Sequence, residues 1–169
     1  HPLAAIAGAA PIMERMREIF FSSTFGGETL SLAAAAAVLD KLRREPVVET
    51  LRTTGKQVLD GVAERIARHD AQDLLSVDGH PAWSFFTIHP PSGQDEWALK
   101  TLFLQEMFAR GVLTLGTHNI SCAHAESGVV ERLLEVYDEV IPLLREAVAE
   151  GSVADRLHAD SLRPLFSVR

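Results

Sequence analysis

Apolar residues recur at helical spacing in three long segments of the chain, with charged residues between them. These segments are residues 47–69, 96–110 and 127–150, and the pattern predicts three amphipathic helices. Gly111 and Gly151 follow the second and third segments directly. Glycine closes many helices because it adopts the left-handed conformation without strain, so we expect the two helices to end there.

An alanine-rich segment, residues 30–42, predicts a fourth helix, with almost no polar residue before Asp40. A helix that is apolar on most sides must also be packed on most sides. Glu28 lies near its start, where the helix dipole favours a carboxylate. Thr29 or Ser31 can provide the N-terminal cap.

Strand-forming residues occur in two regions. Residues 74–89 predict two antiparallel strands with a turn at Asp78-Gly79. Residues 112–115 and 120–123 predict two further short strands around a turn at 116–119. The order helix, two strands, helix, two strands, helix is typical of a small α+β domain, in which helices cover one face of a mainly antiparallel sheet.

Composition narrows the class of protein. Of the residues, 47% are hydrophobic and 23% are charged, as in folded domains that bury a sizeable core. The net charge of −7 disfavours nucleic acid and acidic membrane surfaces, and no apolar run is long enough to cross a bilayer, so we expect neither partner. The single cysteine, Cys122, excludes an internal disulfide. We expect a small core residue there and a reducing, cytoplasmic compartment.

Residues 20–30, FFSSTFGGETL, join a Ser/Thr/Gly turn to the alanine-rich helix. The hydroxyls of Ser22, Ser23 and Thr24 can donate to phosphate oxygens beside exposed helix N–H groups, and the glycines at 26–27 allow the backbone to approach a ligand. Two interpretations stay open from these residues alone. The segment is either an ordinary cap and turn or the phosphate site of a cofactor.

With its flanking segments, this turn resembles the class III (fold type I) pyridoxal-phosphate aminotransferases, in particular the glutamate-1-semialdehyde 2,1-aminomutase type. The likeness lies in HPLAAIAG at 1–8, a short helix near 11–18, the STFGG turn and the SLAAAAAVL helix, and it extends over nearly the full chain. It implies the C-terminal part of the α/β fold type I. On this basis residues 1–45 are the edge of the large cofactor-binding domain with a connecting helix, 46–151 the small α+β domain, and 152–169 a tail.

The resemblance also implies a cofactor, pyridoxal 5'-phosphate, a small amino or keto substrate and a homodimer with the active site at the subunit interface. Thr24, with Ser23 beside it, is the implied contact to the cofactor phosphate of the neighbouring subunit. The usual Asn-Pro after the two glycines is replaced by Glu28-Thr29. Glu28 must therefore face away from the phosphate or pair with a cation.

The resemblance places the lysine that binds the cofactor covalently just upstream of residue 1. The lysines in the chain are Lys41, Lys56 and Lys100, which we expect at the solvated surface. We therefore expect no catalytic residue in this chain. We expect the chain to be a portion of an enzyme that moves an amino group, and to be inactive by itself. The alternative is a non-catalytic binding or interaction domain that keeps the scaffold without the lysine.

Substrate recognition is less defined by the sequence. Many class III transaminases place an arginine near the last strands, where it clamps a substrate carboxylate. This chain has no arginine between Gly111 and Glu131. Aminomutase-like members of the family also lack it. His118 and Asn119 either face the active-site mouth or form a polar loop bonded to its own backbone. We expect His124 to be structural. No metal is expected, because the other internal histidines lack metal-ligand spacing: His69, His80, His89 and His158.

Overall fold

The computed structural model describes residues 3–22 and 24–163, which fall into two compact units, His1–Val47 and Val48–Arg169. Ser23, the sequence-predicted neighbour of Thr24 at the phosphate, lies outside the described residues. The domain limits implied by the resemblance stay a prediction.

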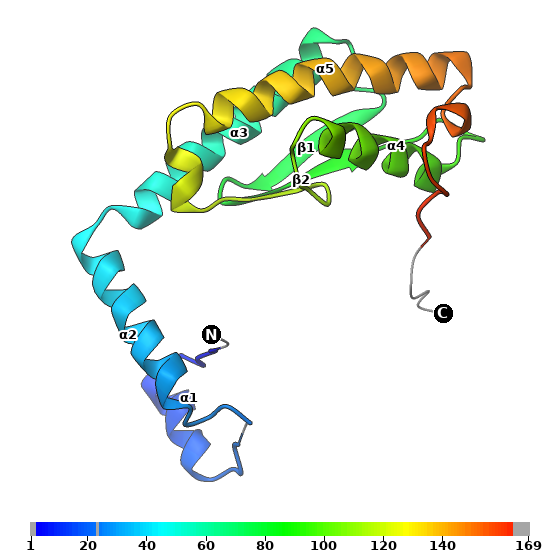
Figure 1. Cartoon of the computed structure of the whole chain (residues 1–169). Helices are drawn as coiled ribbons and strands as arrows, with labels where there is room; N and C mark the ends of the chain where they lie inside the picture. The colour runs from blue at the N-terminus through cyan, green and yellow to red at the C-terminus, as the bar shows by residue number, and fades with distance from the viewer. Residues whose placement is uncertain (1–2, 23, 164–169) are drawn as a thin grey trace. The chain divides into compact units, whose positions relative to one another are not determined.

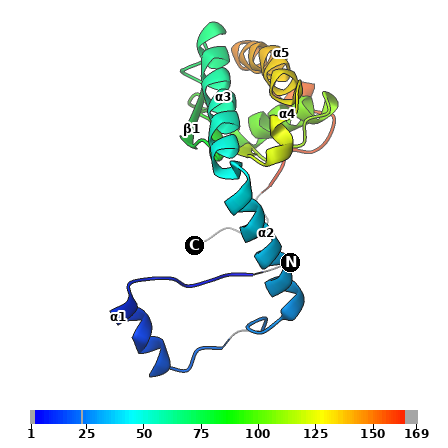
Figure 2. The ribbon, with the colours of Figure 1, turned by 90° about the vertical axis from the view of Figure 1, so that its left-hand side faces the viewer.

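The first unit contains a short helix and a long one (Figure 2). Helix α1 (Ala10–Met13) continues into the 3₁₀ turn η1 (Glu14–Arg17), and helix α2 spans Thr29–Arg44. Pro11 lies in the first turn of α1, where its missing N–H leaves no hydrogen bond unmade. Helix α2 ends before Pro46, because the residue before a proline is disfavoured in helical conformation.

Helix α2 lacks the packing that its apolar sequence predicts. Ser31 is its only buried residue, and the side chains of Leu30, Val38 and Leu39 are more than half exposed. The rest of the first unit supplies only one helix of four residues and a 3₁₀ turn of four residues to cover a helix of 16. The prediction of burial on most sides is therefore wrong for this chain by itself.

The second unit contains three long helices and a three-stranded antiparallel sheet of order β1-β2-β3 (Figure 1). Its elements confirm the predicted α+β arrangement, although the second strand pair is reduced to a single strand. They are α3 (Val47–Arg68), β1 (Leu75–His80), β2 (Trp83–Ile88), α4 (Glu96–Ala109), β3 (Thr117–Asn119), η2 (Cys122–Ala125), α5 (Val129–Glu150) and η3 (Ala154–Arg156).

Within the described residues of the second unit, one face of the sheet is buried and the other is exposed. Along β2, Ser84 and Phe86 are buried, whereas Trp83, Phe85 and Thr87 are exposed. Successive side chains of a strand point to opposite faces, so this alternation separates a core face from an open face. The core face receives α4 and α5.

Aromatic rings connect the sheet to these two helices. The ring of Phe86 in β2 lies 4.8 Å from that of Phe103 in α4 and 5.2 Å from that of Tyr137 in α5, measured between centroids. Tyr137 is fully buried. Such ring pairs add to the hydrophobic stabilisation of the buried area, so this cluster is the centre of the core.

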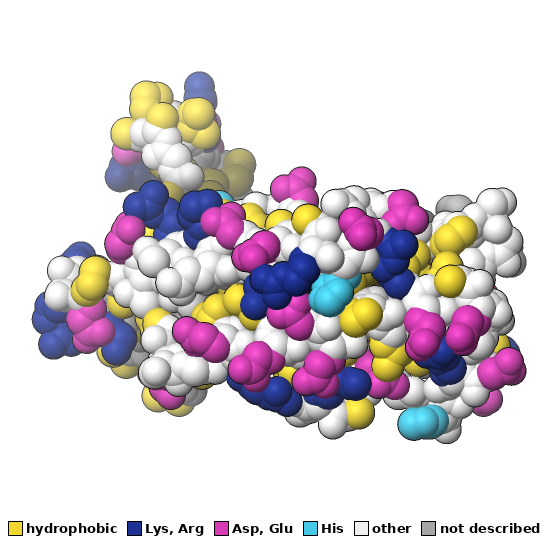
Figure 3. All heavy atoms as spheres, turned by 90° about the horizontal axis from the view of Figure 1, so that it is seen from above, with side chains coloured by type: hydrophobic (Ala, Val, Ile, Leu, Met, Phe, Trp, Pro, Cys, Tyr) yellow, Lys and Arg dark blue, Asp and Glu magenta, His cyan; other side chains and the backbone are white. Residues whose placement is uncertain are grey.

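Helices α3 and α5 lie side by side and are joined by Arg65 (Figure 1). Its Nε donates to the Leu134 carbonyl at 2.9 Å and lies 3.0 Å from Asp138 Oδ2. Arg68 reaches the same carboxylate. On the face drawn in Figure 3, basic side chains are intermixed with acidic ones. The contact between the two helices therefore combines apolar packing with paired charges.

The hairpin turn lies at Pro81-Ala82 and not at Asp78-Gly79, so the sequence prediction is wrong at this point. Asp78 and Gly79 are paired inside β1, and Gly79 is the partner of Ser84. Gly79 has a φ of +122°, and a Cβ atom there would lie 3.0 Å from the Trp83 carbonyl oxygen. The glycine is thus required for close strand approach, whereas Pro81, which has no N–H to donate, suits the turn.

The second pair of predicted strands is also wrong. Residues 116–119, expected as a turn, contain the strand β3, while 112–115 form a loop and 120–123 lead into the 3₁₀ turn η2. Strand β3 pairs with β2, with His118 opposite Ser84. The inward position of His118 has polar partners in the core that a sequence pattern cannot show.

The tail packs on the second unit as far as Leu162, whose N–H donates to the Thr101 hydroxyl at 2.8 Å. The side chain of Gln105 in α4 accepts from the N–H of His158 at 2.7 Å and donates to the carbonyl of Arg156 at 3.0 Å. The Arg156 guanidinium lies 2.9 Å from Glu146 and 2.7 Å from Glu150. In the part of the chain that the structure describes, no helix has the length and apolar character needed to span a bilayer.

Gly55 in α3 tests the fit between this helix and the hairpin. A Cβ atom at position 55 would overlap the carbonyl group of Pro81. We expect Gly55→Ala to lower the free energy of unfolding by about 3 kcal/mol, because overpacking forces backbone shifts. Urea unfolding followed by circular dichroism measures it. The exposed Gln57→Ala on the same helix should change stability by less than about 0.5 kcal/mol, and equal midpoints for the two variants would contradict the packing.

Candidate functional site

The turn after α1 exposes Thr24, the residue predicted to contact phosphate. Residues 24–27 form turns, and the Glu28 N–H donates to the Phe25 carbonyl at 3.3 Å. Gly27 has no left-handed φ, and a Cβ there would meet no atom within 4 Å. Neither the backbone conformation nor the packing of this chain requires glycine at 27. The open space beside it is therefore accessible to a ligand or another chain.

Glu28 caps α2 with its own carboxylate. The side chain accepts hydrogen bonds from the N–H groups of Leu30 at 2.9 Å and Ser31 at 2.6 Å. Hydrogen bonds from the Ser31 side chain and then from these two N–H groups hold the pKa of Glu28 below its usual value. Thr29 is already helical, so the prediction that Thr29 or Ser31 provides the cap is wrong.

This cap accounts for the Glu28-Thr29 departure from the family turn. The carboxylate pairs with N–H groups of its own helix, so of the two alternatives given for Glu28 the pairing with a cation is not needed. Because the N–H groups of Leu30 and Ser31 already donate to Glu28, they are not available to an anion. A phosphate at this turn would depend on the Thr24 hydroxyl and the turn backbone.

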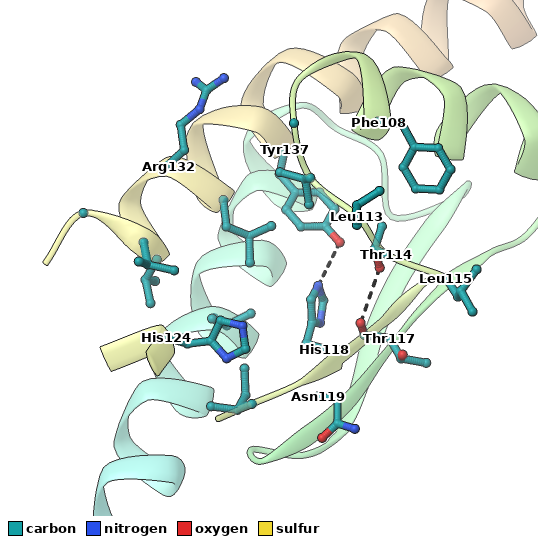
Figure 4. A pocket seen from close by; sticks show the side chains of 18 of the residues that line it. Phe108, Leu113, Thr114, Leu115, Thr117, His118, Asn119, His124, Arg132 and Tyr137 are labelled. Atoms are coloured by element: carbon teal, nitrogen blue, oxygen red, sulfur yellow. Dashed lines mark hydrogen bonds between the residues drawn. The ribbon is translucent and has the colours of Figure 1, made fainter. Parts of the chain in front are cut away.

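A second candidate site is a pocket of about 1000 Å³ in the second unit (Figure 4). It lies between the loop 111–116, strand β3, the turn η2 and the first turns of α5, with Val58 of α3 contributing to its lining. Most of its lining is apolar, including Phe108, Val112, Leu113, Leu115, Ile120, Val129, Val130 and Leu133. We call it the apolar pocket.

His118 is the buried polar residue of this pocket. Its Nδ1 lies 2.9 Å from Ser84 Oγ and its Nε2 lies 2.8 Å from the Tyr137 hydroxyl, toward which it points in Figure 4. Burial lowers the pKa of His118 to about 4 and raises the pKa of Tyr137. The imidazole is therefore neutral at pH 7 with both nitrogens occupied, which suits a structural role.

The other predicted polar residues lie around the pocket. Asn119 is exposed and contributes to the lining, whereas His118 bonds to β2 and α5 and not to its own loop. His124 Nδ1 accepts from the Ser121 N–H at 2.8 Å, which confirms a structural role before α5. Cys122 is exposed because η2 lies at the surface, so the prediction of a core cysteine is wrong.

Arg132 also lines the pocket, although its sequence pattern does not indicate this. Its guanidinium lies 3.2 Å from Glu135 Oε2 and 3.4 Å from the Arg110 carbonyl. In Figure 4 it points away from His118 and Tyr137. The i, i+3 spacing of Arg132 and Glu135 on one helix does predict the ion pair between them. The arginine is thus not positioned as a carboxylate clamp inside the pocket.

The lysines do not line the apolar pocket. Lys41 pairs with Glu45 and Lys56 with Asp60, both exposed as predicted. The Lys100 ammonium lies over the Trp97 ring, 5.3 Å from its centroid, on a half-buried side chain. Among the described residues, no group of three or more His, Cys, Asp or Glu side chains is placed to hold a metal ion.

No family model matches the chain. Individual known proteins, however, are similar to it in sequence. The chain is 30% identical over 151 residues to a glutamate-1-semialdehyde 2,1-aminomutase of Methanosarcina acetivorans, covering 82% of this chain and 35% of that protein. This likeness supports a class III pyridoxal-phosphate aminotransferase-like family for the chain. A 2'-deamino-2'-hydroxyneamine transaminase of Streptomyces kanamyceticus is 35% identical over 83 residues, 49% of this chain and 20% of that protein. The chain thus spans about a third or less of these relatives, which fits a C-terminal portion of the family's enzymes.

A solved structure supports the fold. This chain matches the structure of the PLP internal aldimine form of the Sphingopyxis sp. MTA144 FumI protein with a TM-score of 0.68. The match covers 84% of this chain and 33% of that chain at 23% sequence identity. At this identity the likeness shows the fold alone. The chain has the fold of the C-terminal part of a fold type I enzyme.

The hydrogen-bonded position of His118 predicts a pH dependence of stability. Its folded-state pKa of about 4 lies below the ordinary value of 6.5, so between these values the unfolded chain binds a proton that the folded chain does not. The free energy of unfolding is therefore unaffected by the protonation of His118 above pH 6.5. It falls by about 3 kcal/mol as the pH is lowered to 4, because protonation of His118 favours the unfolded chain. Urea unfolding at pH 7 and pH 4 measures this loss.

A comparison of variants separates His118 from the other titrating groups. His118→Gln should be less stable at pH 7 but lose about 3 kcal/mol less than the wild type between pH 7 and pH 4. The exposed Gln57→Ala, which changes no titrating group, should lose as much as the wild type. An identical loss in His118→Gln and the wild type would show that the buried imidazole does not set this dependence.

Proposed function

We propose that this chain is the C-terminal portion of a pyridoxal-phosphate-dependent aminotransferase or glutamate-1-semialdehyde aminomutase-like enzyme, which moves an amino group on a small amino or keto compound. The 30% identity to the aminomutase over 82% of the chain carries the proposal. The exposed turn at Thr24 and the match to the solved structure support it. The cofactor is pyridoxal 5'-phosphate, which when bound supplies the electron sink for amino-group chemistry.

In this proposal Thr24 and Ser23 hold the cofactor phosphate of the neighbouring subunit in a homodimer. The described residues fit such a group. The Thr24 side chain is exposed, and the space beside Gly27 is open to phosphate oxygens. A hydroxyl donating to a phosphate dianion forms a charge-assisted hydrogen bond. The exposed apolar residues of α2 are consistent with further burial against a partner subunit or domain.

The covalent attachment of the cofactor lies outside this chain in the proposal. Lys41 and Lys56 are engaged in ion pairs on exposed helix surfaces, and Lys100 is held over Trp97. The chain alone is therefore inactive, and its residues bind phosphate and enclose the substrate. We further propose the limits 1–45, 46–151 and 152–169 for its parts, and a cytoplasmic location consistent with the single cysteine.

Replacing the phosphate contact should weaken cofactor retention. In the full-length enzyme we expect Thr24→Ala to retain the cofactor about 10- to 100-fold less tightly, since a hydrogen bond to a charged group is lost. Dialysis followed by the absorbance of bound cofactor measures this affinity. Thr87→Ala, an exposed threonine of β2, is the matched control and should retain it fully. Equal retention by both variants would remove Thr24 from the proposed site.

The lysines provide a separate test on this chain. Pyridoxal phosphate followed by borohydride reduction should modify no lysine preferentially, because none of the three lies in a site that orients an aldehyde. Peptide mapping by mass spectrometry reads out the extent of modification at each position. Preferential, stoichiometric modification of one lysine would contradict the proposed inactivity of the chain and place covalent chemistry within it.

A further inference from the structure

The apolar pocket exposes large hydrophobic side chains to solvent. Leu113 is 87% exposed, Leu115 is 76% exposed and Phe108 is 44% exposed. All three line the pocket, and Figure 4 shows them on its α4 and 111–116 loop side. Removing such surface from water is favourable. A ligand with an apolar body therefore gains binding free energy here without any change in the fold.

The charges around the pocket decide which apolar ligand it suits. Arg132 is the only residue of the lining with a permanent charge, and its guanidinium is already held by Glu135 and the Arg110 carbonyl. Both ring nitrogens of His118 are hydrogen-bonded inside the core, and His124 Nδ1 is bonded to Ser121. A ligand carboxylate would find no uncommitted cation in this lining, and its desolvation would be unfavourable.

The pocket is large and has polar groups at its edge. About 1000 Å³ is the upper end of the size range of small-molecule pockets, so the pocket suits an extended ligand. Asn119 and Ser127, both exposed, line the pocket and carry side-chain oxygen atoms that can accept hydrogen bonds from an ammonium group. The chain's net charge of −7 also favours a cationic ligand over an anionic one.

We propose that the apolar pocket receives the extended, uncharged body of an amphiphilic amine, whose amino group remains at the polar rim. This inference rests on the proposed function and assigns its substrate class: an amine with a long apolar chain, in place of a small dicarboxylic amino compound. The pocket holds the part of the molecule that does not react. It therefore adds no chemical step and determines which amines are accepted.

Calorimetric titration with an unreactive probe tests the pocket directly. Octyltrimethylammonium carries an apolar chain on a cationic head but cannot condense with an aldehyde; tetramethylammonium is the head alone, and glutamate represents a dicarboxylate. We expect saturable binding of octyltrimethylammonium and none of the other two. Leu113→Asp should weaken this binding about tenfold or more, because it places a charge on the apolar wall.

Leu162→Asp is the matched control, since Leu162 is exposed and does not line the pocket. It should bind octyltrimethylammonium as the wild type does. Leu113 is so exposed that its replacement should leave folding intact, which circular dichroism checks. Wild-type protein without saturable binding, equal binding of glutamate, or equal affinities of Leu113→Asp and the wild type would each overturn the proposal.

Cofactor retention separates this inference from the function on which it rests. The Leu113→Asp full-length enzyme should retain pyridoxal phosphate as the wild type does, while losing affinity for octyltrimethylammonium. Failure of the wild-type enzyme to retain cofactor would remove the proposed function but leave a measured amphiphile site. Retained cofactor with no amphiphile binding would remove the substrate class alone.

Discussion

The fully buried hydroxyl of Tyr137 constrains the whole second unit. A phenol in the core needs a hydrogen-bond partner, because an unpaired buried polar group is costly. His118 provides it and binds Ser84 with its other nitrogen. Since a neutral imidazole has one N–H, one of its nitrogens donates and the other accepts. Helix α5, strand β3 and strand β2 are thus fixed relative to one another, and the loop 111–116 and η2 extend from this fixed base.

A different constraint shapes the first unit. Helix N-termini attract anions, but in α2 the carboxylate of Glu28 occupies N–H groups of the first turn. The same substitution that departs from the family turn thus stabilises the helix locally. Any phosphate bound here depends on a hydroxyl and on open backbone near Gly27, and not on the helix terminus. A strong cap therefore weakens anion binding at this helix terminus, because the capping carboxylate already occupies the N–H groups.

Family membership and substrate choice rest on separate features of this chain. The likeness to aminomutases and transaminases extends along most of the sequence, yet one scaffold accommodates many substrates. In the substrate class proposed above, specificity comes from the apolar pocket, where Arg132 is held by Glu135 of its own helix and by the Arg110 carbonyl. The two histidines of the lining are hydrogen-bonded within the fold. The absence of an arginine clamp in the sequence and the apolar lining in the structure are consistent with each other.

The sequence by itself determined the helices, because their apolar period and their closing glycines at 111 and 151 are local properties of the chain. It also indicated the family through the turn at Thr24. Only the tertiary structure decided where the hairpin turns, that residues 117–119 form a strand, and that Arg132 reaches the pocket. The strand at 117–119 depends on partners distant in the chain, because His118 bonds to Ser84 and Tyr137. The hairpin turn depends on nearer residues, but the need for glycine at 79 arises only when β2 lies against β1. A local pattern cannot contain such contacts, because their free energy exists only once the chain has folded.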